Sequence, residues 1–202
     1  DCEYRNLVGT RQSIAGTLGV SNDEAASLLV KLEGMELVKS QGDGSVLTDE
    51  GRSHALRVIR THRLWERYLA DETGLPETKW HAEAERREHI MTPHEVEALS
   101  SHMGNPRYDP HGDPIPTETG EIPRRAGHPL TGSSAGSVAE ITHIEDEPAV
   151  VYAQLVALGL HPGMRVRVIN ISPQRIRFEA EGVENVLAPI MAANITVQPL
   201  PH

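Results

Sequence analysis

Apolar residues recur at helical spacing in the first part of the chain. Between residues 10 and 38 they fall three and four positions apart, in two runs separated by the tripeptide GVS. This pattern predicts two short helices joined by a tight turn, and Ser21 with Glu24 three residues later predicts a capping box on the second helix. Residues 37–40 and 45–48 flank the turn sequence QGDG and predict a β-hairpin. A helix-turn-helix followed by a hairpin is the winged-helix arrangement.

A long amphipathic helix is predicted next, because apolar residues keep the helical spacing from about Thr48 through His62 to Leu69. Its apolar face is larger than a small domain can cover. Together with a short helix at residues 96–99, this face is predicted to form either a dimer interface or an ordinary intramolecular core. The pattern alone does not distinguish these two alternatives.

Hydrophobic periodicity disappears between residues 104 and 136, where Pro, Gly, Ser and Thr dominate and a linker is predicted. Beyond it, short runs of β type are separated by turn residues, and one helix over residues 149–158 ends at Gly159. These features predict a small five-stranded β-barrel with strands at residues 138–144, 164–171, 175–179, 183–187 and 195–197.

A length of 202 residues, of which 38% are apolar, indicates two or three small domains. We also expect a cytoplasmic protein, for the following reasons. No stretch reaches the roughly 18 consecutive apolar residues of a membrane span, and the first residues lack the pattern of a signal peptide. The lone Cys2 cannot form an intrachain disulfide, which fits a reducing compartment. Since the chain begins with Asp1 where an intact chain begins with Met, we expect further residues before it.

Six potential metal ligands lie at helical spacings in two short runs. In each run the spacings of three, four, seven or eight residues place imidazoles and carboxylates on one helix face. The simpler interpretation is that these are solvated charges on surface helices, as is usual for any single His or Glu. Six together favour a metal-binding cage formed by His62, Glu66, His81, Glu85, Glu88 and His89.

Four segments occur in an order that is typical of one protein family. After the winged helix come HRLWERYLADETGLP, HAEAERREHIM and NPRYDPHGDPIP, and the tail contains QLVALGLHPGMRVRVI. In this order the chain resembles the diphtheria toxin repressor family of metal-dependent transcriptional regulators over nearly its whole length. The tail resembles the SH3-like domain of the ferrous-transport A (FeoA) type. The fold class is therefore expected to be α+β, combining a winged helix-turn-helix, a helical domain and a small SH3-like β-barrel.

The resemblance also implies a division into domains. Residues 1–56 are expected to form the DNA-binding winged helix, although the first helix of the family is largely absent from this sequence. Residues 57–116 are expected to form the helical metal-binding and dimerisation domain. Residues 117–136 are assigned to the linker, and residues 137–202 to the FeoA-type domain.

The same resemblance implies two metal sites in each subunit. The primary, activating site takes Glu85, Glu88 and His89, with a further ligand from the first helix. In iron-responsive members the position of Glu85 is a Cys, whereas manganese-responsive relatives carry Glu. Oxygen and imidazole ligands without a thiolate suit Mn²⁺ or Fe²⁺. The ancillary site is expected to contain His62, Glu66, His81, His143 and Asp146, the last two from the barrel.

The expected function is metal-dependent repression of genes for metal uptake. A bound cation would neutralise the ligand cluster, fix the helices and select the arrangement in which a homodimer binds a palindromic DNA operator. A net charge of −10 argues against a protein that simply coats nucleic acid but leaves a locally basic surface possible. The residues expected to contact DNA are Arg11, Ser21, Asn22, Ser27, Lys31 and Lys39, with Arg5 and, near the wing, Arg52 as further phosphate contacts.

Two other functions were weighed. A His and Glu cluster can activate water for hydrolysis, but the sequence lacks HEXXH and a separate general base, so we predict no enzyme. The recognition helix carries Asp23 and Glu24 near its start, where carboxylates weaken binding to phosphates. The alternative is therefore a metal sensor that acts through protein contacts and binds DNA weakly or not at all. His111 and His128, within the predicted linker, are expected to be solvated.

Overall fold

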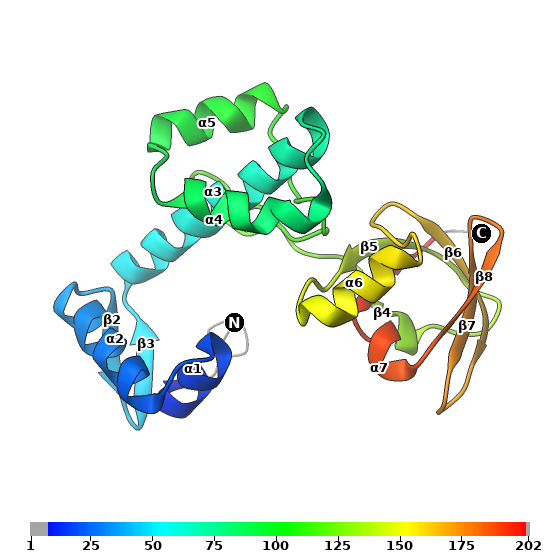
Figure 1. The fold of residues 1–202 in the computed structure, drawn as a ribbon, viewed down its shortest axis with the longest axis horizontal. Helices are drawn as coiled ribbons and strands as arrows, with labels where there is room; N and C mark the ends of the chain where they lie inside the picture. Colours follow the sequence, from blue (N-terminus) through cyan, green and yellow to red (C-terminus); the bar gives the residue numbers. More distant parts are fainter. Residues whose placement is uncertain (1–7, 201–202) are drawn as a thin grey trace. The chain divides into compact units, whose positions relative to one another are not determined.

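The protein is described by a computed structural model covering residues 8–200, so Cys2 and Arg5 lie outside the described residues. The chain divides between residues 59 and 60 into an N-terminal unit and a C-terminal unit (Figure 1). Each unit is described by itself below. Within residues 8–200, no helix combines the length and the apolar character that a membrane span needs.

The N-terminal unit contains the predicted helix-turn-helix and hairpin. Its helices are α1 (Arg11–Leu18) and α2 (Asn22–Gly34). The hairpin strands are β2 (Val38–Gln41) and β3 (Gly44–Leu47), which pair antiparallel. A short strand that the sequence did not reveal, β1 (Gly9–Thr10), pairs with the other edge of β3. The predicted winged-helix topology is confirmed.

Local side-chain chemistry defines the turn between α1 and α2. Gly19 ends α1 with φ of 64°, a left-handed conformation that favours glycine. The Ser21 hydroxyl accepts a hydrogen bond from the Glu24 amide at 3.2 Å, and the Glu24 carboxylate accepts one from the Ser21 amide at 2.9 Å. The hydrogen bonds that the Glu24 carboxylate accepts from the Ser21 amide and hydroxyl lower the pKa of Glu24 below its ordinary value. The predicted capping box is therefore confirmed.

Gly51, in the first turn of α3 (Asp49–Glu72), is predicted to tolerate no side chain. A Cβ at this position would lie 1.8 Å from the carbonyl oxygen of Leu37. Gly51→Ala is therefore expected to destabilise the protein by about 3 kcal/mol or more, because backbone must move to relieve the clash. Urea unfolding measures the change. Gly16→Ala is the control, since its Cβ meets nothing within 4 Å and alanine favours a helix. Equal stability of both variants would contradict the prediction.

The first part of the C-terminal unit is helical. The end of α3 is followed by the short helix η1 (Glu77–Lys79), then by α4 (Trp80–Glu88) and α5 (Pro93–His102). A small core forms around Leu64, Val96 and Ile115, with Met91, Leu99 and Met103 packed against it. The long helix α3 and the helix predicted at residues 96–99, which is α5, are both present. Their inward faces form an intramolecular core.

The segment of residues 107–116 is packed against α3, which corrects the prediction that a linker begins at residue 104. Arg60 donates a hydrogen bond to the carbonyl oxygen of Pro116, and Arg63 donates one to that of Pro114, both at 2.6 Å. Arg60 is 8% exposed and also forms a two-pronged ion pair with the Glu97 carboxylate at 2.9 and 2.7 Å. Buried Arg60 and half-buried Arg63 thus hold this segment by hydrogen bonds, in addition to the apolar packing of Ile115 in the core around Leu64.

The second part of the C-terminal unit is a six-stranded antiparallel sheet in the order β4-β9-β5-β6-β7-β8. Five of these strands were predicted. The sixth, β4, lies in the predicted linker and pairs with β9. The bounds are β4 (His128–Pro129), β5 (Val138–Ile144), β6 (Arg165–Ile171), β7 (Ile176–Ala180), β8 (Val183–Leu187) and β9 (Ile195–Pro199), with helices η2 (Leu130–Gly132), α6 (Ala149–Ala157) and α7 (Pro189–Ala192).

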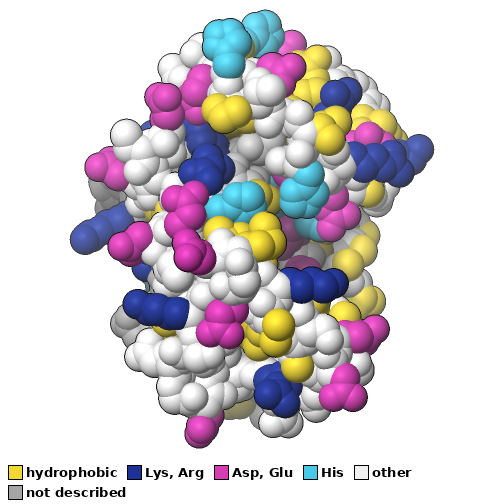
Figure 2. All heavy atoms as spheres, turned by 90° about the vertical axis from the view of Figure 1, so that its left-hand side faces the viewer, with side chains coloured by type: hydrophobic (Ala, Val, Ile, Leu, Met, Phe, Trp, Pro, Cys, Tyr) yellow, Lys and Arg dark blue, Asp and Glu magenta, His cyan; other side chains and the backbone are white. Residues whose placement is uncertain are grey.

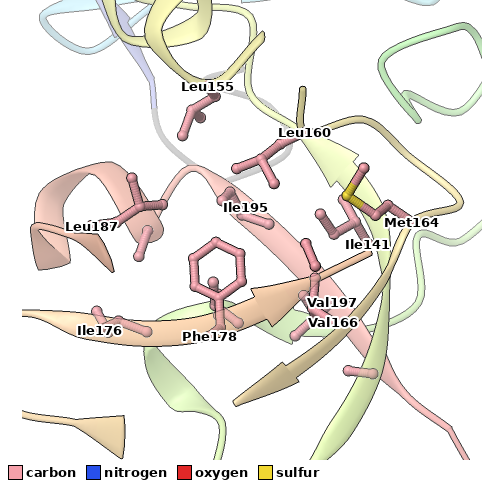
Figure 3. Close-up of a cluster of buried hydrophobic side chains, with 14 of the residues drawn as sticks. Ile141, Leu155, Leu160, Met164, Val166, Ile176, Phe178, Leu187, Ile195 and Val197 are labelled. Atoms are coloured by element: carbon pink, nitrogen blue, oxygen red, sulfur yellow. The ribbon is translucent and has the colours of Figure 1, made fainter. Parts of the chain in front are cut away.

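One hydrophobic core lies inside this sheet. Figure 3 shows side chains from β5, β6, β7, β9 and α6 converging on it, among them Ile141, Val166, Phe178, Ile195 and Leu155. Inward and outward residues alternate along the strands, as expected for a sheet with one buried face. Phe178, the only phenylalanine of the chain, is fully buried. This core holds α6 and β5 in place beside the ligand groups described next.

Candidate metal centre

Three of the predicted ligands come together where α3 meets the start of α4. His62 and Glu66 are one helical turn apart on α3, and His62 Nε2 lies 3.1 Å from Glu66 Oε1. His81 of α4 completes the set, with its Nδ1 3.2 Å from His62 Nε2 and 3.4 Å from Glu66 Oε1. We call these three residues the His62 group. Its members can offer one ligand atom each to a shared ion.

A second ligand group contains Glu66 with two residues that the sequence analysis did not select. Asp109 and His111 lie in the 107–116 segment and are both 4% exposed. His111 Nδ1 is 3.8 Å from Glu66 Oε2. We call Glu66, Asp109 and His111 the His111 group, whose ligand atoms all lie within 4.8 Å of one another. The prediction that His111 is solvated is therefore wrong, and Glu66 belongs to both groups.

Signals for the His111 group were present in the sequence. The run DPHGDP places two carboxylates and an imidazole within five residues, inside NPRYDPHGDPIP, one of the segments that carry the family resemblance. Its high Pro and Gly content pointed to a linker instead. His128, the other histidine expected to be solvated, is partly buried in β4, and its Nε2 lies 3.2 Å from Ser133 Oγ.

The residues expected at the primary site are only partly gathered. Glu88 Oε2 lies 2.6 Å from His62 Nδ1, and Glu88 Oε1 lies 3.1 Å from His89 Nε2. Glu85 is directed to His81 instead, with 3.5 Å between Glu85 Oε1 and His81 Nε2. Glu85 and His89 are exposed, whereas Glu88 is largely buried. Through its two ring nitrogens, His62 connects the His62 group to Glu88.

The two ligands expected from the barrel belong to neither group. His143 of β5 is 2% exposed, and its Nδ1 lies 3.0 Å from Arg125 Nη1. Its Nε2 lies 3.5 Å from Asp113 Oδ2, and Asp113 also pairs with Arg125. Asp146 is partly exposed just beyond β5. Arginine is thus the cation that His143 and Asp113 contact in this structure.

Burial and neighbouring charges shift the acid–base chemistry of the centre. Burial, together with the charge of Asp113, raises the pKa of Asp109 to about 7. Burial also acts to raise the pKa of Asp113, but His143 and nearby arginines outweigh it and hold that pKa at about 2. The pKa of Glu66 is lowered, because His62 and the other imidazoles outweigh its burial. Burial acts to lower the pKa of His62, but the carboxylates of Glu66 and Glu88 outweigh it and raise that pKa.

The donor atoms of the centre fit a divalent cation. Glu66 Oε1 and His111 Nδ1 are buried and make no well-directed hydrogen bond within residues 8–200, and the nearest polar atoms to Glu66 Oε1 are the imidazole nitrogens of His62 and His81. Buried polar atoms normally have partners, so such atoms indicate a ligand. The two groups offer only carboxylate oxygens and imidazole nitrogens, the donor set that suits Mn²⁺ and Fe²⁺. Glu66, His62 and His81 would hold one ion, and Glu66, Asp109 and His111 would hold another.

The metal affinity of the His111 group is expected to fall as the pH drops below about 7. Metal binds the deprotonated carboxylate, whereas Asp109 with a pKa of about 7 holds its proton below that pH. Each pH unit below about 7 should therefore weaken apparent binding about tenfold, and above it this dependence should vanish.

Mn²⁺ titrations between about pH 5.5 and 8 measure this dependence. Asp109→Asn is the matched control, because it removes the titrating carboxyl and leaves His62, whose pKa is raised, in place. The Asp109→Asn variant should bind Mn²⁺ more weakly, and its affinity should depend less steeply on pH, by about one released proton. A wild-type affinity that stays constant over this pH range would contradict the prediction.

The predicted DNA-contacting residues are all exposed in the N-terminal unit. Two of them already make local bonds, since the Ser21 hydroxyl takes part in the capping box and the Ser27 hydroxyl donates to the Asp23 carbonyl at 2.9 Å. Acidic and basic side chains are interspersed on the face that Figure 2 shows. The six residues in question are Arg11, Ser21, Asn22, Ser27, Lys31 and Lys39.

An apolar groove lies between α3, α4 and α5. It has a volume of about 460 Å³, and its lining includes Trp65, Tyr68, Met91 and Leu99. Arg87 lies over the Trp65 ring at 4.9 Å. The predicted apolar face of α3 therefore has two parts, one in the core around Leu64 and one along this groove.

Both parts of the C-terminal unit match known protein families. Residues 48–117 match the family model described as "Iron dependent repressor, metal binding and dimerisation domain". Residues 128–199 match the model of the FeoA domain. The first match contains every member of the His62 and His111 groups, and the second contains the six-stranded sheet.

Relatives cover nearly the whole chain. The iron-dependent repressor IdeR of Mycobacterium tuberculosis (strain ATCC 25618 / H37Rv) is 32% identical, over 94% of this chain and 88% of its own length. The diphtheria toxin repressor of Corynebacterium glutamicum is 31% identical, over 84% of this chain and 79% of its own. A manganese-dependent transcriptional repressor in complex with manganese has a TM-score of 0.83 at 29% identity, covering 96% of this chain and 92% of its own. ScaR with bound Cd²⁺ has a TM-score of 0.79 at 28% identity, covering 95% and 92%.

Fold, ligand groups and relatives together define a class, the metal-dependent transcriptional repressors with a winged helix and a FeoA domain. The chain belongs to the iron-dependent repressor family, which includes the diphtheria toxin repressor. The family resemblance and the predicted fold class are thereby confirmed. The family consists of transcriptional repressors and not of enzymes, which excludes the hydrolase interpretation.

Proposed function

We propose that this chain is a homodimeric repressor that binds a palindromic DNA operator in the cytoplasm when Mn²⁺ or Fe²⁺ occupies its metal centre. The observation that carries the proposal is Glu66, which is almost fully buried and shared by two groups of potential ligands. A buried carboxylate is costly unless a cation or hydrogen bonds compensate it, and here its nearest partners are the imidazoles of His62, His81 and His111, which are themselves metal ligands when deprotonated. Because metal binding would offset that cost, we infer that metal stabilises the packing of the elements around Glu66.

A bound divalent cation would supply the positive charge that the buried carboxylates of both groups lack. Glu66 then links α3 to His81 of α4 and to the segment that carries Asp109 and His111. His62 extends this link to Glu88, near the end of α4. With these elements fixed, one arrangement of the helices is selected, and affinity for metal becomes affinity for DNA.

The primary site predicted from the resemblance remains part of the proposal. Glu85, Glu88 and His89 lie near the end of α4, where exposed Glu85 and His89 are accessible to a further ligand from another segment and Glu88 is largely buried. His143 and Asp146 are still proposed as the ancillary-site ligands from the barrel, and for His143 this requires that its contact with Arg125 be exchanged for metal. The apolar groove beside Trp65 is proposed as the dimer interface, in keeping with the dimerisation domain that the chain matches.

Whether iron or manganese is the signal does not follow from the relatives, whose names include both metals. The described donor set contains no thiolate, and the only cysteine of the chain is Cys2. Oxygen and nitrogen donors of this kind suit either ion. Mn²⁺ and Fe²⁺ are therefore the two candidate signals.

Metal-dependent DNA binding tests the proposed function. Genomic DNA fragments are titrated anaerobically with the full chain and either Mn²⁺ or Fe²⁺, beside the double variant Glu88→Ala/His89→Ala. We expect metal to induce binding in the wild type and not in the double variant, and the more effective ion identifies the signal. Tight metal binding without any DNA binding at low salt would contradict the proposal. That result would favour the metal sensor that acts through protein contacts, an alternative motivated by Asp23 and Glu24 on the recognition helix.

A further inference from the structure

The His111 imidazole contacts two aromatic side chains from different elements. The Tyr152 ring is nearly perpendicular to it, with 5.2 Å between centroids and an interplanar angle of 84°. The Trp80 ring, at the start of α4, is tilted to it by 47°, with 6.3 Å between centroids. These contacts restrict the orientation of the His111 ring.

Tyr152 is anchored at both of its ends. It lies on α6, where it packs against the hydrophobic core of the C-terminal sheet. Its hydroxyl donates a hydrogen bond to the carboxylate of Glu77, in the short helix that precedes α4. Burial and the neighbouring Glu77 carboxylate raise the pKa of Tyr152, so the hydroxyl keeps its proton and remains a donor. The hydrogen bond therefore links α6 to the short helix before α4.

The backbone of His111 is held as firmly as its ring. Its amide donates to Asp109 Oδ1 at 2.9 Å, and its carbonyl oxygen accepts from the Ile144 amide at 3.0 Å. With backbone and ring both fixed, Nδ1 has no hydrogen-bond partner and stays 3.8 Å from Glu66. A ligand whose orientation is set before binding loses little entropy when metal arrives.

We propose that Tyr152 is a positioning residue of the His111 group, which orients the imidazole and ties the FeoA-type domain to the start of α4. This inference rests on the proposed function, since it assumes that the group binds metal. It goes beyond it by assigning a role in metal affinity to a side chain that is not a ligand. Supporting residues of this kind typically change metal affinity about 10- to 100-fold.

Two substitutions separate the contacts of Tyr152. Tyr152→Leu removes the ring from His111 while keeping an apolar residue on the core. Tyr152→Phe keeps the ring and removes only the bond to Glu77. With Mn²⁺ alone as the probe, we expect the leucine variant to bind about tenfold more weakly and the phenylalanine variant to lie between it and the wild type. Val151→Ala is the matched control, because it removes side-chain volume from α6 and from the same core while leaving the Tyr152 ring beside His111.

A double-mutant cycle shows whether Tyr152 acts through His111. In a His111→Ala background, Tyr152→Leu should cause no further loss of Mn²⁺ affinity, because the ring that it orients is gone. A purely structural role of Tyr152 predicts the same fractional loss in both backgrounds, and that result would overturn the inference.

Hydrogen exchange of the metal-free protein gives a readout that does not depend on metal. Tyr152→Leu should speed exchange of the Ile144 amide, which is bonded to His111, and leave the amides of β7 unchanged. Unchanged exchange at Ile144 would overturn the inference. Equal Mn²⁺ affinity of the wild type and Tyr152→Leu would overturn it while leaving the proposed function intact. Absence of Mn²⁺ binding by the wild type would overturn both.

Discussion

Replacing Glu66 with Gln is expected to abolish metal binding at both ligand groups at once. Glu66 is the only residue common to the two groups within residues 8–200, and its carboxylate is 3% exposed. Gln has nearly the same shape but no charge, so it removes a ligand from each ion without leaving a cavity. Loss of a supporting residue alone costs about 10- to 100-fold in metal affinity, and loss of a shared ligand should cost about 100-fold or more.

Mn²⁺ titration by equilibrium dialysis measures this loss, and metal-dependent DNA binding should disappear with it. Glu83→Gln is the control, because Glu83 lies on α4 and pairs only with Arg86 in the ion pairs of the described part. It should leave metal affinity within about twofold of the wild type. Retention of wild-type stoichiometry and affinity by Glu66→Gln would show that the two groups are not the metal centre.

Gly112→Ala is expected to disrupt the segment that carries the His111 group. Gly112 has φ of 90°, and a Cβ there would lie 2.0 Å from the carbonyl oxygen of Thr142 on β5. The substitution combines backbone strain with a clash against the strand that holds His111, so it should destabilise the protein by about 3–5 kcal/mol. Mn²⁺ affinity should fall with it, because Asp109 and His111 lose their positions.

Gly136→Ala separates strain from the clash. Gly136 also has a positive φ, of 84°, but a Cβ there meets nothing within 4 Å. This variant should therefore be destabilised by only about 1 kcal/mol and bind Mn²⁺ normally. Urea unfolding and Mn²⁺ titration of the two variants check the prediction. If Gly112→Ala unfolds like Gly136→Ala and binds metal normally, the close approach of the segment to β5 does not matter for the centre.

The helices, the hairpin and most of the sheet were predictable because their signals are local. The capping box at Ser21 and the alternation along β5 involve residues a few positions apart, and such patterns persist whatever the rest of the chain does. His62 and Glu66 were likewise predictable, because a helix fixes their separation. His81 was predicted from the helical spacing of its own run of ligands, and the family resemblance then placed it in one site with His62 and Glu66.

The 107–116 segment could not be predicted in this way. The segment is held against α3 by Arg60 and Arg63, which lie 56 and 51 positions before the carbonyl groups to which they donate hydrogen bonds. Nothing in the local pattern of prolines, glycines and charges reports such long-range bonds. The burial of His111 and Asp109 follows from them, and so does the second ligand group. Short β4 was missed for the same reason, since it is defined only by pairing with β9.

The buried position of Glu66 between two ligand groups is the central claim, and anomalous scattering tests it most directly. Crystals of the full chain grown with Mn²⁺ would give an anomalous difference map at the manganese edge. We predict one peak bounded by Glu66, His62 and His81, and a second bounded by Glu66, Asp109 and His111. Manganese found only beside Glu88 and His89, with Glu66 bonded to protein atoms alone, would contradict the account.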